Sequence, residues 1–207
     1  TAPSPGKAVD REEAKGSGYV PLPFLRDFYT KAYARIRKHM GTEKTVVFHD
    51  GFRCTAWNRF FRKAGFENVA LDTHIYIFAM EHFVPVAKPW VYRIYLHACM
   101  RQVRKAQKAV PVIVGEWCIS NQYANRMDHS VMSLKERSDV QRARYREIAA
   151  MELRAWEETA GWFYWNYQLL RDRETPTDES WKDSWDLARC LRNGWLTSED
   201  ILKGEKG

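Results

Sequence analysis

Four segments of the chain have the hydrophobic pattern of buried or half-buried strands. Residues 45–48 are β-branched or aromatic, and residues 68–78 carry apolar side chains at almost all odd positions and several polar ones at even positions. This period of two predicts a strand that packs one face on a core and carries polar groups on the other. Residues 110–118, mostly aliphatic, and residues 162–167, mostly aromatic, are predicted as the other two strands.

Helices are predicted between these strands. Residues 21–40 begin with two prolines, continue with apolar residues at helical spacing, and stop at Gly41. The other predicted helices are residues 57–63, 90–108, 136–159 and about 185–191. Alternating helices and strands predict an α/β fold with a parallel sheet and right-handed crossovers. Four such strands are half of a (β/α)8 barrel, which typically needs about 250 residues.

Composition narrows the class of protein. Hydrophobic residues make up 45% of the 207 residues, which is sufficient for a core. No apolar run approaches the roughly 20 residues of a membrane span. The net charge of +7 could indicate nucleic-acid binding, but the basic residues fall mainly on predicted helices and acidic residues are interspersed. Solvated helix faces are therefore the preferred interpretation, and we expect neither a nucleic-acid nor a membrane partner.

The cysteines bear on the cellular compartment. All four are far apart and match no metal-binding spacing (Cys54, Cys99, Cys118 and Cys190). We interpret them as free thiols of a cytoplasmic protein. Secretion stays open, because the chain begins with Thr1 and not with an initiator methionine, so the native start can be missing.

The strand at residues 110–118 carries the strongest chemical signal. Its apolar run ends on Glu116, followed by Trp117. Catalytic groups of β/α barrels lie at the carboxyl ends of the strands, and a tryptophan offers a flat apolar face to a sugar ring. The alternative is a glutamate that caps the next helix or meets a basic loop.

Several motifs in order resemble glycoside hydrolase family 5, most closely its exo-β-1,3-glucanase-like branch. They are Phe48-His49-Asp50-Gly51-Phe52, Leu71-Asp72-Thr73-His74-Ile75-Tyr76, Val114-Gly115-Glu116-Trp117 and Gly161-Trp162-Phe163-Tyr164-Trp165, with Ser184-Trp185-Asp186 through Asn193-Gly194 near the end. The resemblance implies strands five to eight of a (β/α)8 TIM barrel. The chain would then be the C-terminal half of one barrel domain, with a loop at 1–18, strands and helices at 19–195 and a tail at 196–207.

The resemblance also implies roles for individual residues. Glu116 would be the nucleophile of a retaining β-glycosidase that needs no cofactor and no metal. His74 and Tyr76 would contact that nucleophile and the first sugar, and Trp165 would stack beneath the sugar. Each of the three has a structural alternative: a histidine bonded to backbone, a tyrosine at the barrel mouth, and core packing.

Further residues are assigned to the substrate site on weaker grounds. Trp117 and Phe52 are expected at the sugar or at the outer edge of the site, together with His49. Asp50 is included as a contact residue, although a turn or cap role is the stronger interpretation. Cys118 is interpreted as packing.

One element of the family pattern is absent. The family's acid/base glutamate follows an asparagine, and this chain contains no Asn-Glu dipeptide. We therefore expect the acid/base outside this chain, and either a second chain with the N-terminal half-barrel or self-association through two unpaired strand edges. The alternative function is a carbohydrate-binding pseudo-enzyme or an inactive fragment with an aromatic sugar platform. The sugar, the linkage and exo or endo action stay open.

Overall fold

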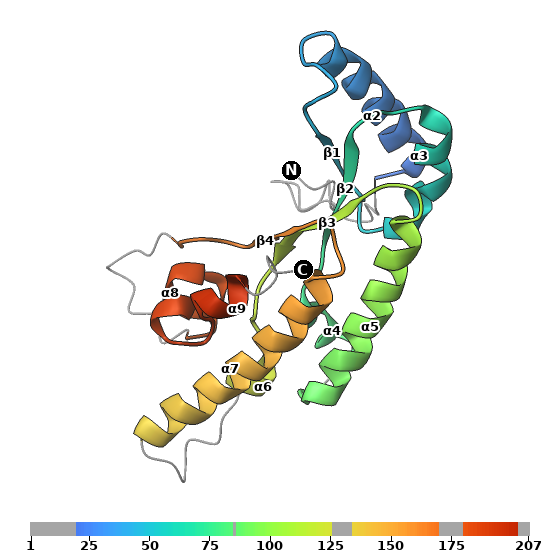
Figure 1. Ribbon diagram of the computed structural model, residues 1–207. Coiled ribbons are helices and arrows are strands. Elements are labelled where there is room, and N and C mark those ends of the chain that lie inside the picture. The colour runs from blue at the N-terminus through green and yellow to red at the C-terminus, as the bar shows by residue number, and fades with distance from the viewer. Residues whose placement is uncertain (1–19, 85, 126–133, 170–179, 203–207) are drawn as a thin grey trace, which may run out of the picture. The chain divides into compact units, whose positions relative to one another are not determined.

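The computed structural model describes residues 20–84, 86–125, 134–169 and 180–202 (Figure 1). The chain divides into two compact units, residues 1–73 with 101–113 and residues 74–100 with 114–207. The loop expected at 1–18, and most of the loop around Pro176, lie outside the described residues. None of the described helices is long and apolar enough to cross a membrane.

The first unit contains a parallel pair of strands and two helices. Its strands are β1 (Val46–His49) and β2 (Val69–His74), with Val46 opposite Val69 and His49 opposite Asp72. Helix α2 (Leu22–Arg37) starts directly after Pro21, whose ring fixes a backbone angle suited to a helix start. The 3₁₀ helix η1 (Cys54–Trp57) and helix α3 (Asn58–Ala64) connect the strands.

Aromatic rings form the core of the first unit. The Tyr29 ring of α2 lies 5.0 Å from Phe48 of β1 and 5.3 Å from Trp57, measured between ring centroids. Trp57 is completely buried and donates its indole N–H to the Asp50 carbonyl over 2.7 Å. Each fully buried ring contributes on the order of 1.5–3 kcal/mol of transfer free energy. This packing fixes α2 and the turn after β1 against the strands.

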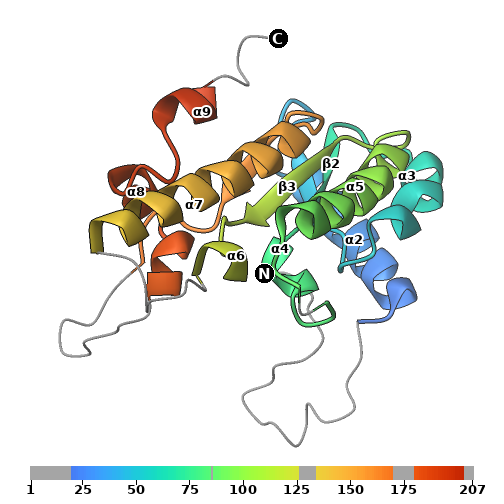
Figure 2. The ribbon, with the colours of Figure 1, turned by 90° about the horizontal axis from the view of Figure 1, so that it is seen from below.

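The second unit is built around two further parallel strands. β3 (Val112–Trp117) has its last four residues in this unit and pairs with β4 (Trp162–Tyr164), with Val114 opposite Trp162 and Trp117 opposite Tyr164. The long helix α7 (Leu134–Trp156) connects them and runs alongside β3 (Figure 2). The other elements are α4 (Ile77–Met80), α5 (Pro89–Ala106), α6 (Gln122–Asn125), η2 (Ser180–Trp185), α8 (Leu187–Arg192) and α9 (Ser198–Leu202). The part of α5 from residue 101 onward belongs to the first unit.

Hydrogen bonds join the strands in the order β1-β2-β3-β4. The predicted α/β fold with a four-stranded parallel sheet is therefore confirmed. Every predicted strand and helix exists in the structure, with ends that shift by a few residues.

The sequence prediction was wrong at three places. The strand expected at 68–78 ends at His74, because Ile77 and Met80 share a buried face of α4 at the helical spacing of three. The segment between the strand at 110–118 and the helix at 136–159, for which no helix was predicted, contains the short helix α6. The tail expected from residue 196 contains α9, which begins with a capping arrangement: the Asp200 amide donates to the Thr197 hydroxyl while the Thr197 amide donates to the Asp200 carboxylate.

Candidate active site

Glu116 lies at the carboxyl end of β3, as the sequence predicts. Its Oε2 accepts a hydrogen bond from the Tyr76 hydroxyl over 2.7 Å and lies 3.2 Å from Nδ1 of His74. The Glu116 side chain is 24% exposed, whereas that of His74 is 8% exposed. The carboxylate is thus held by two side chains on one oxygen and still open to a ligand.

The register between the second and third strand segments brings these three residues together. Ile75, just beyond the end of β2, donates its amide to the Glu116 carbonyl over 3.1 Å. His74 and Tyr76 flank Ile75, and their side chains lie on the same side because neighbours two apart in an extended segment share a face. Because Ile75 pairs with the backbone of Glu116, the side chains of His74 and Tyr76 on either side of it both reach the Glu116 carboxylate. All of these residues belong to the second unit.

The surroundings of Tyr76 keep its hydroxyl protonated. Burial, and next the hydrogen bond to Glu116, raise the pKa of Tyr76 far above its ordinary value of 10. The phenol is therefore a permanent hydrogen-bond donor to the carboxylate at any physiological pH. Oε1 of Glu116 accepts no hydrogen bond from a described residue, which leaves it as the oxygen that can meet a substrate atom.

An aromatic wall adjoins the Tyr76 ring. Trp185, at the end of η2, stacks on Tyr76 with ring centroids 5.4 Å apart and an interplanar angle of 29°. Phe78 contacts the same indole at 5.1 Å. The Asn166 amide donates to the Trp185 carbonyl, which fixes η2 beside the segment after β4. The sequence analysis quoted Trp185 only as part of the closing motif Ser184-Trp185-Asp186 and gave it no site role; that motif was the available signal.

Trp165 follows β4 and keeps an exposed ring. Its amide donates to the Trp117 carbonyl over 2.8 Å, which extends the β3–β4 pairing, and its side chain is 45% exposed. The exposure agrees with a platform and not with core packing, the alternative that the sequence left open. Its role toward a sugar stays a prediction.

Trp117 is a correction to the sequence analysis. Its side chain is completely buried, with ring contacts to Trp156, Trp162 and Tyr164. Successive residues of a strand point to opposite faces, so a Glu116 that faces the site turns Trp117 toward α7. Trp117 is a core residue and offers no ring to a ligand.

Asp50 and Phe52 lie in the turn after β1, in the first unit. Asp50 is 1% exposed, and its carboxylate accepts the Phe52 amide over 2.7 Å and the Thr73 hydroxyl over 2.9 Å. These bonds assign Asp50 to the turn, the interpretation that the sequence favoured over a ligand contact. Phe52 is 41% exposed and has a left-handed backbone (φ 58°), which the Asp50 cap supports. Its substrate role stays a prediction.

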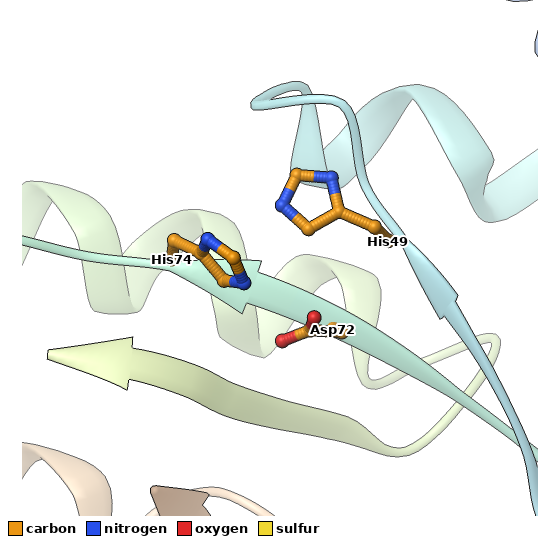
Figure 3. Close-up of side chains that lie close together, drawn as sticks. All are labelled: His49, Asp72 and His74. Carbon is orange, nitrogen blue, oxygen red and sulfur yellow. The ribbon is translucent and has the colours of Figure 1, made fainter. Parts of the chain in front are cut away.

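His49, Asp72 and His74 carry the donor types of a metal site. Figure 3 shows His49 at the end of β1 and the other two on β2, and His49 is the register partner of Asp72. Histidine and carboxylate together suit zinc and related ions. His74, however, already directs Nδ1 at Glu116, and Nδ1 of His49 accepts the Gly51 amide over 2.9 Å. His49 and Asp72 belong to the first unit and His74 to the second, and we assign no metal to the three side chains.

Sequence comparison with curated proteins finds glucan 1,3-beta-glucosidases. The chain is 23% identical over 209 aligned residues to "Glucan 1,3-beta-glucosidase 2" of Schizosaccharomyces pombe, covering 86% of this chain and 36% of that protein. It is 27% identical over 201 residues to "Probable glucan 1,3-beta-glucosidase A" of Neosartorya fischeri, covering 84% of this chain and 44% of that protein. The corresponding protein of Emericella nidulans is 38% identical over 96 residues, 45% of this chain and 22% of that protein.

Comparisons with solved structures and with protein-family models add less information about the family than the curated relatives do. A thermostable mutant of a xylanase from Cellvibrio japonicus has a TM-score of 0.41 and 19% identity to this chain, covering 80% of this chain and 53% of that one. No protein-family model matches the chain. The chain spans less than half the length of the curated relatives described above. The resemblance read from the motifs is nevertheless confirmed, since the chain is a homologue of the glucan 1,3-beta-glucosidases over most of its own length.

Proposed function

We propose that this chain supplies the nucleophile half of the active site of a retaining β-glycoside hydrolase acting on β-glucans or β-glucosides. The observation that carries the proposal is the anchored carboxylate of Glu116 at a parallel strand end, with Tyr76 and His74 on one oxygen. The names of the relatives support a β-glucan substrate class. In this proposal the sheet is half of a β/α barrel.

The geometry suits the first step of such a reaction. A retaining glycosidase needs one ionised carboxylate to attack the anomeric carbon and a second, protonated one on the leaving oxygen. The hydrogen bond from the Tyr76 hydroxyl and the neighbouring His74 imidazole orient the Glu116 carboxylate. Oε1 forms the bond to the anomeric carbon as the glycosidic bond breaks, and water later displaces the sugar. The acid/base that protonates the leaving oxygen belongs to a polypeptide segment outside this chain.

A second candidate function is carbohydrate binding without catalysis. The observations in its favour are the exposed ring of Trp165 after β4 and the Trp185 ring stacked on Tyr76, two aromatic surfaces of the kind that bind sugars. The presence of an acid glutamate in the complete gene product separates the two functions.

We also infer that further polypeptide completes the sheet, either an N-terminal half-barrel or a second copy. β1 and β4 are the outer strands, and each pairs with one strand within the described part of the chain. Open strand edges favour pairing with more chain. The intact mass of the functional material shows which polypeptides are present.

The stereochemistry of hydrolysis tests the role of Glu116. If it is a nucleophile, the partner carboxylate lies about 5–5.5 Å away in the complete protein and the first-formed sugar keeps its anomeric configuration. Proton NMR during the first minutes of hydrolysis, before mutarotation, measures this. An inverted first product would make Glu116 a base that activates water.

Substitution of Trp165 tests the sugar platform. We expect Trp165→Ala to weaken a bound monosaccharide inhibitor by about 1–3 kcal/mol, because a ring face that covers the sugar is lost. The matched control is Trp90→Ala on α5, which removes a tryptophan that is 60% exposed from a helix that carries none of the proposed site residues. Equal inhibitor affinity in the parent and both variants would remove Trp165 from the site; thermal unfolding shows that each variant is folded.

A further inference from the structure

A pocket of about 320 Å³ opens in the first unit, between α2 and α3. Two phenylalanines and three basic residues dominate its wall, and the full lining is Arg26, Thr30, Arg59, Phe60, Lys63, Ala64 and Phe66. The volume is at the lower end of the range for small-molecule sites. It lies in a different unit from Glu116 and has no part in the proposed hydrolysis.

The floor of the pocket is aromatic and rigid. The Phe60 and Phe66 rings meet edge to face at 5.5 Å. Phe66 is stacked on Tyr33 with ring centroids 4.1 Å apart, and Phe60 also contacts Trp57. Since both rings are braced by neighbouring aromatics, they present fixed faces and edges to a planar ligand.

The wall of the pocket is cationic. Among the residues that the structure describes, no carboxylate forms an ion pair with Arg59 or Lys63, and no acidic residue is part of the lining. Arg26 is held in place by its Nη2, which donates to the Ala56 carbonyl over 2.9 Å. Its Nε is buried and has no hydrogen-bond partner in the described part of the chain. A buried donor of this kind normally finds an acceptor.

We propose that this pocket binds a small organic anion with a planar apolar body, such as an aromatic carboxylate. The apolar body lies against Phe60 and Phe66, and the anionic group meets Arg26, Arg59 and Lys63. A guanidinium is suited to planar carboxylates, and its charge adds to those of the two helix residues. Neutral glucan oligosaccharides do not match the positive charge of the pocket, so this is a second class of ligand for the protein.

Titration with 2-naphthoate tests the proposal on the protein itself. We expect saturable binding, and about tenfold weaker binding of the neutral analogue 2-naphthylmethanol, since two partly exposed charge contacts contribute up to about 1 kcal/mol each. The variant Arg59→Gln with Lys63→Gln should lose about the same factor in naphthoate affinity for the same reason. Isothermal titration calorimetry measures both affinities.

A control variant with the same net charge separates the pocket from general attraction. Arg35→Gln with Arg62→Gln removes two exposed charges from α2 and α3 outside the lining, and should leave naphthoate binding unchanged. The proposal would be overturned if the two double variants lost naphthoate affinity equally, or if the protein bound 2-naphthylmethanol as tightly as 2-naphthoate. Absence of binding at about 1 mM naphthoate would overturn it as well. Should the pocket variant fail to fold, Thr30→Trp fills the pocket with all charges kept, and undiminished binding by that variant would overturn it equally.

Discussion

Turnover of an aryl β-glucoside falls by several orders of magnitude when Glu116 is replaced by Gln in the complete protein. The substitution keeps the shape of the side chain and lets the amide oxygen accept the Tyr76 hydrogen bond. It removes the negative charge that attacks the anomeric carbon, and loss of a nucleophile removes most of the catalytic rate. Substrate binding should largely survive, so the loss appears in kcat and not in KM.

The matched control for this prediction is Glu157→Gln, an exposed glutamate directly after α7. It makes the same chemical change away from the strand ends and should leave kcat unchanged. A Glu116→Gln enzyme with kcat within about tenfold of the parent would contradict the assignment, because loss of the nucleophile removes most of the catalytic rate. The carbohydrate-binding alternative predicts no turnover in either protein, with binding intact in both.

Glu152 of α7 is the group with the largest expected effect on stability. Its side chain is completely buried, and neither carboxylate oxygen has a hydrogen-bond partner among the described residues. Burial raises the pKa of Glu152 well above its ordinary value of 4.5. The folded protein therefore keeps a proton on Glu152 at pH values where the unfolded chain releases it.

The sign of the pH dependence follows from this difference. Above about pH 4.5 the folded state binds more protons at this site than the unfolded state, so the free energy of unfolding falls as pH rises, by up to about 1.4 kcal/mol per pH unit until the folded pKa is reached. Glu152→Met removes both the titration and the unpaired oxygens at similar volume. We expect it to raise the free energy of unfolding by about 1–3 kcal/mol at neutral pH, the usual cost of an unsatisfied buried polar group.

Urea unfolding at about pH 5 and at about pH 7 measures both effects. The gain from Glu152→Met over the parent should grow between the two pH values, whereas Glu157→Gln should show no such growth. A variant that is less stable than the parent at both pH values would show that the Glu152 carboxyl has a stabilising partner in the folded protein.

The order and type of the four strands and of the longer helices could be predicted from the sequence alone, because each leaves a local pattern. Alternating positions in residues 69–74 and the apolar run before Glu116 mark strands, and apolar residues at helical spacing mark α2. The same pattern placed Glu116 at a strand end. The same alternation predicts that Trp117 is buried, because neighbouring residues of a strand face opposite sides and Glu116 faces the site. The sequence analysis nevertheless placed Trp117 at the sugar because a tryptophan next to a catalytic carboxylate suggested a sugar contact.

The tertiary structure alone decided which side chains meet. The contact of Tyr76 with Glu116 depends on the pairing of Ile75 with the end of β3, which no local pattern specifies. Trp185 contacts Tyr76 from a segment more than a hundred residues further along the chain. In the sequence Glu152 is one of many charged residues of α7, and only the tertiary packing shows that it is buried. Local periodicity fixes which face of an element is apolar, whereas distances between side chains on different elements depend on strand register and helix packing, and these are properties of the assembled fold.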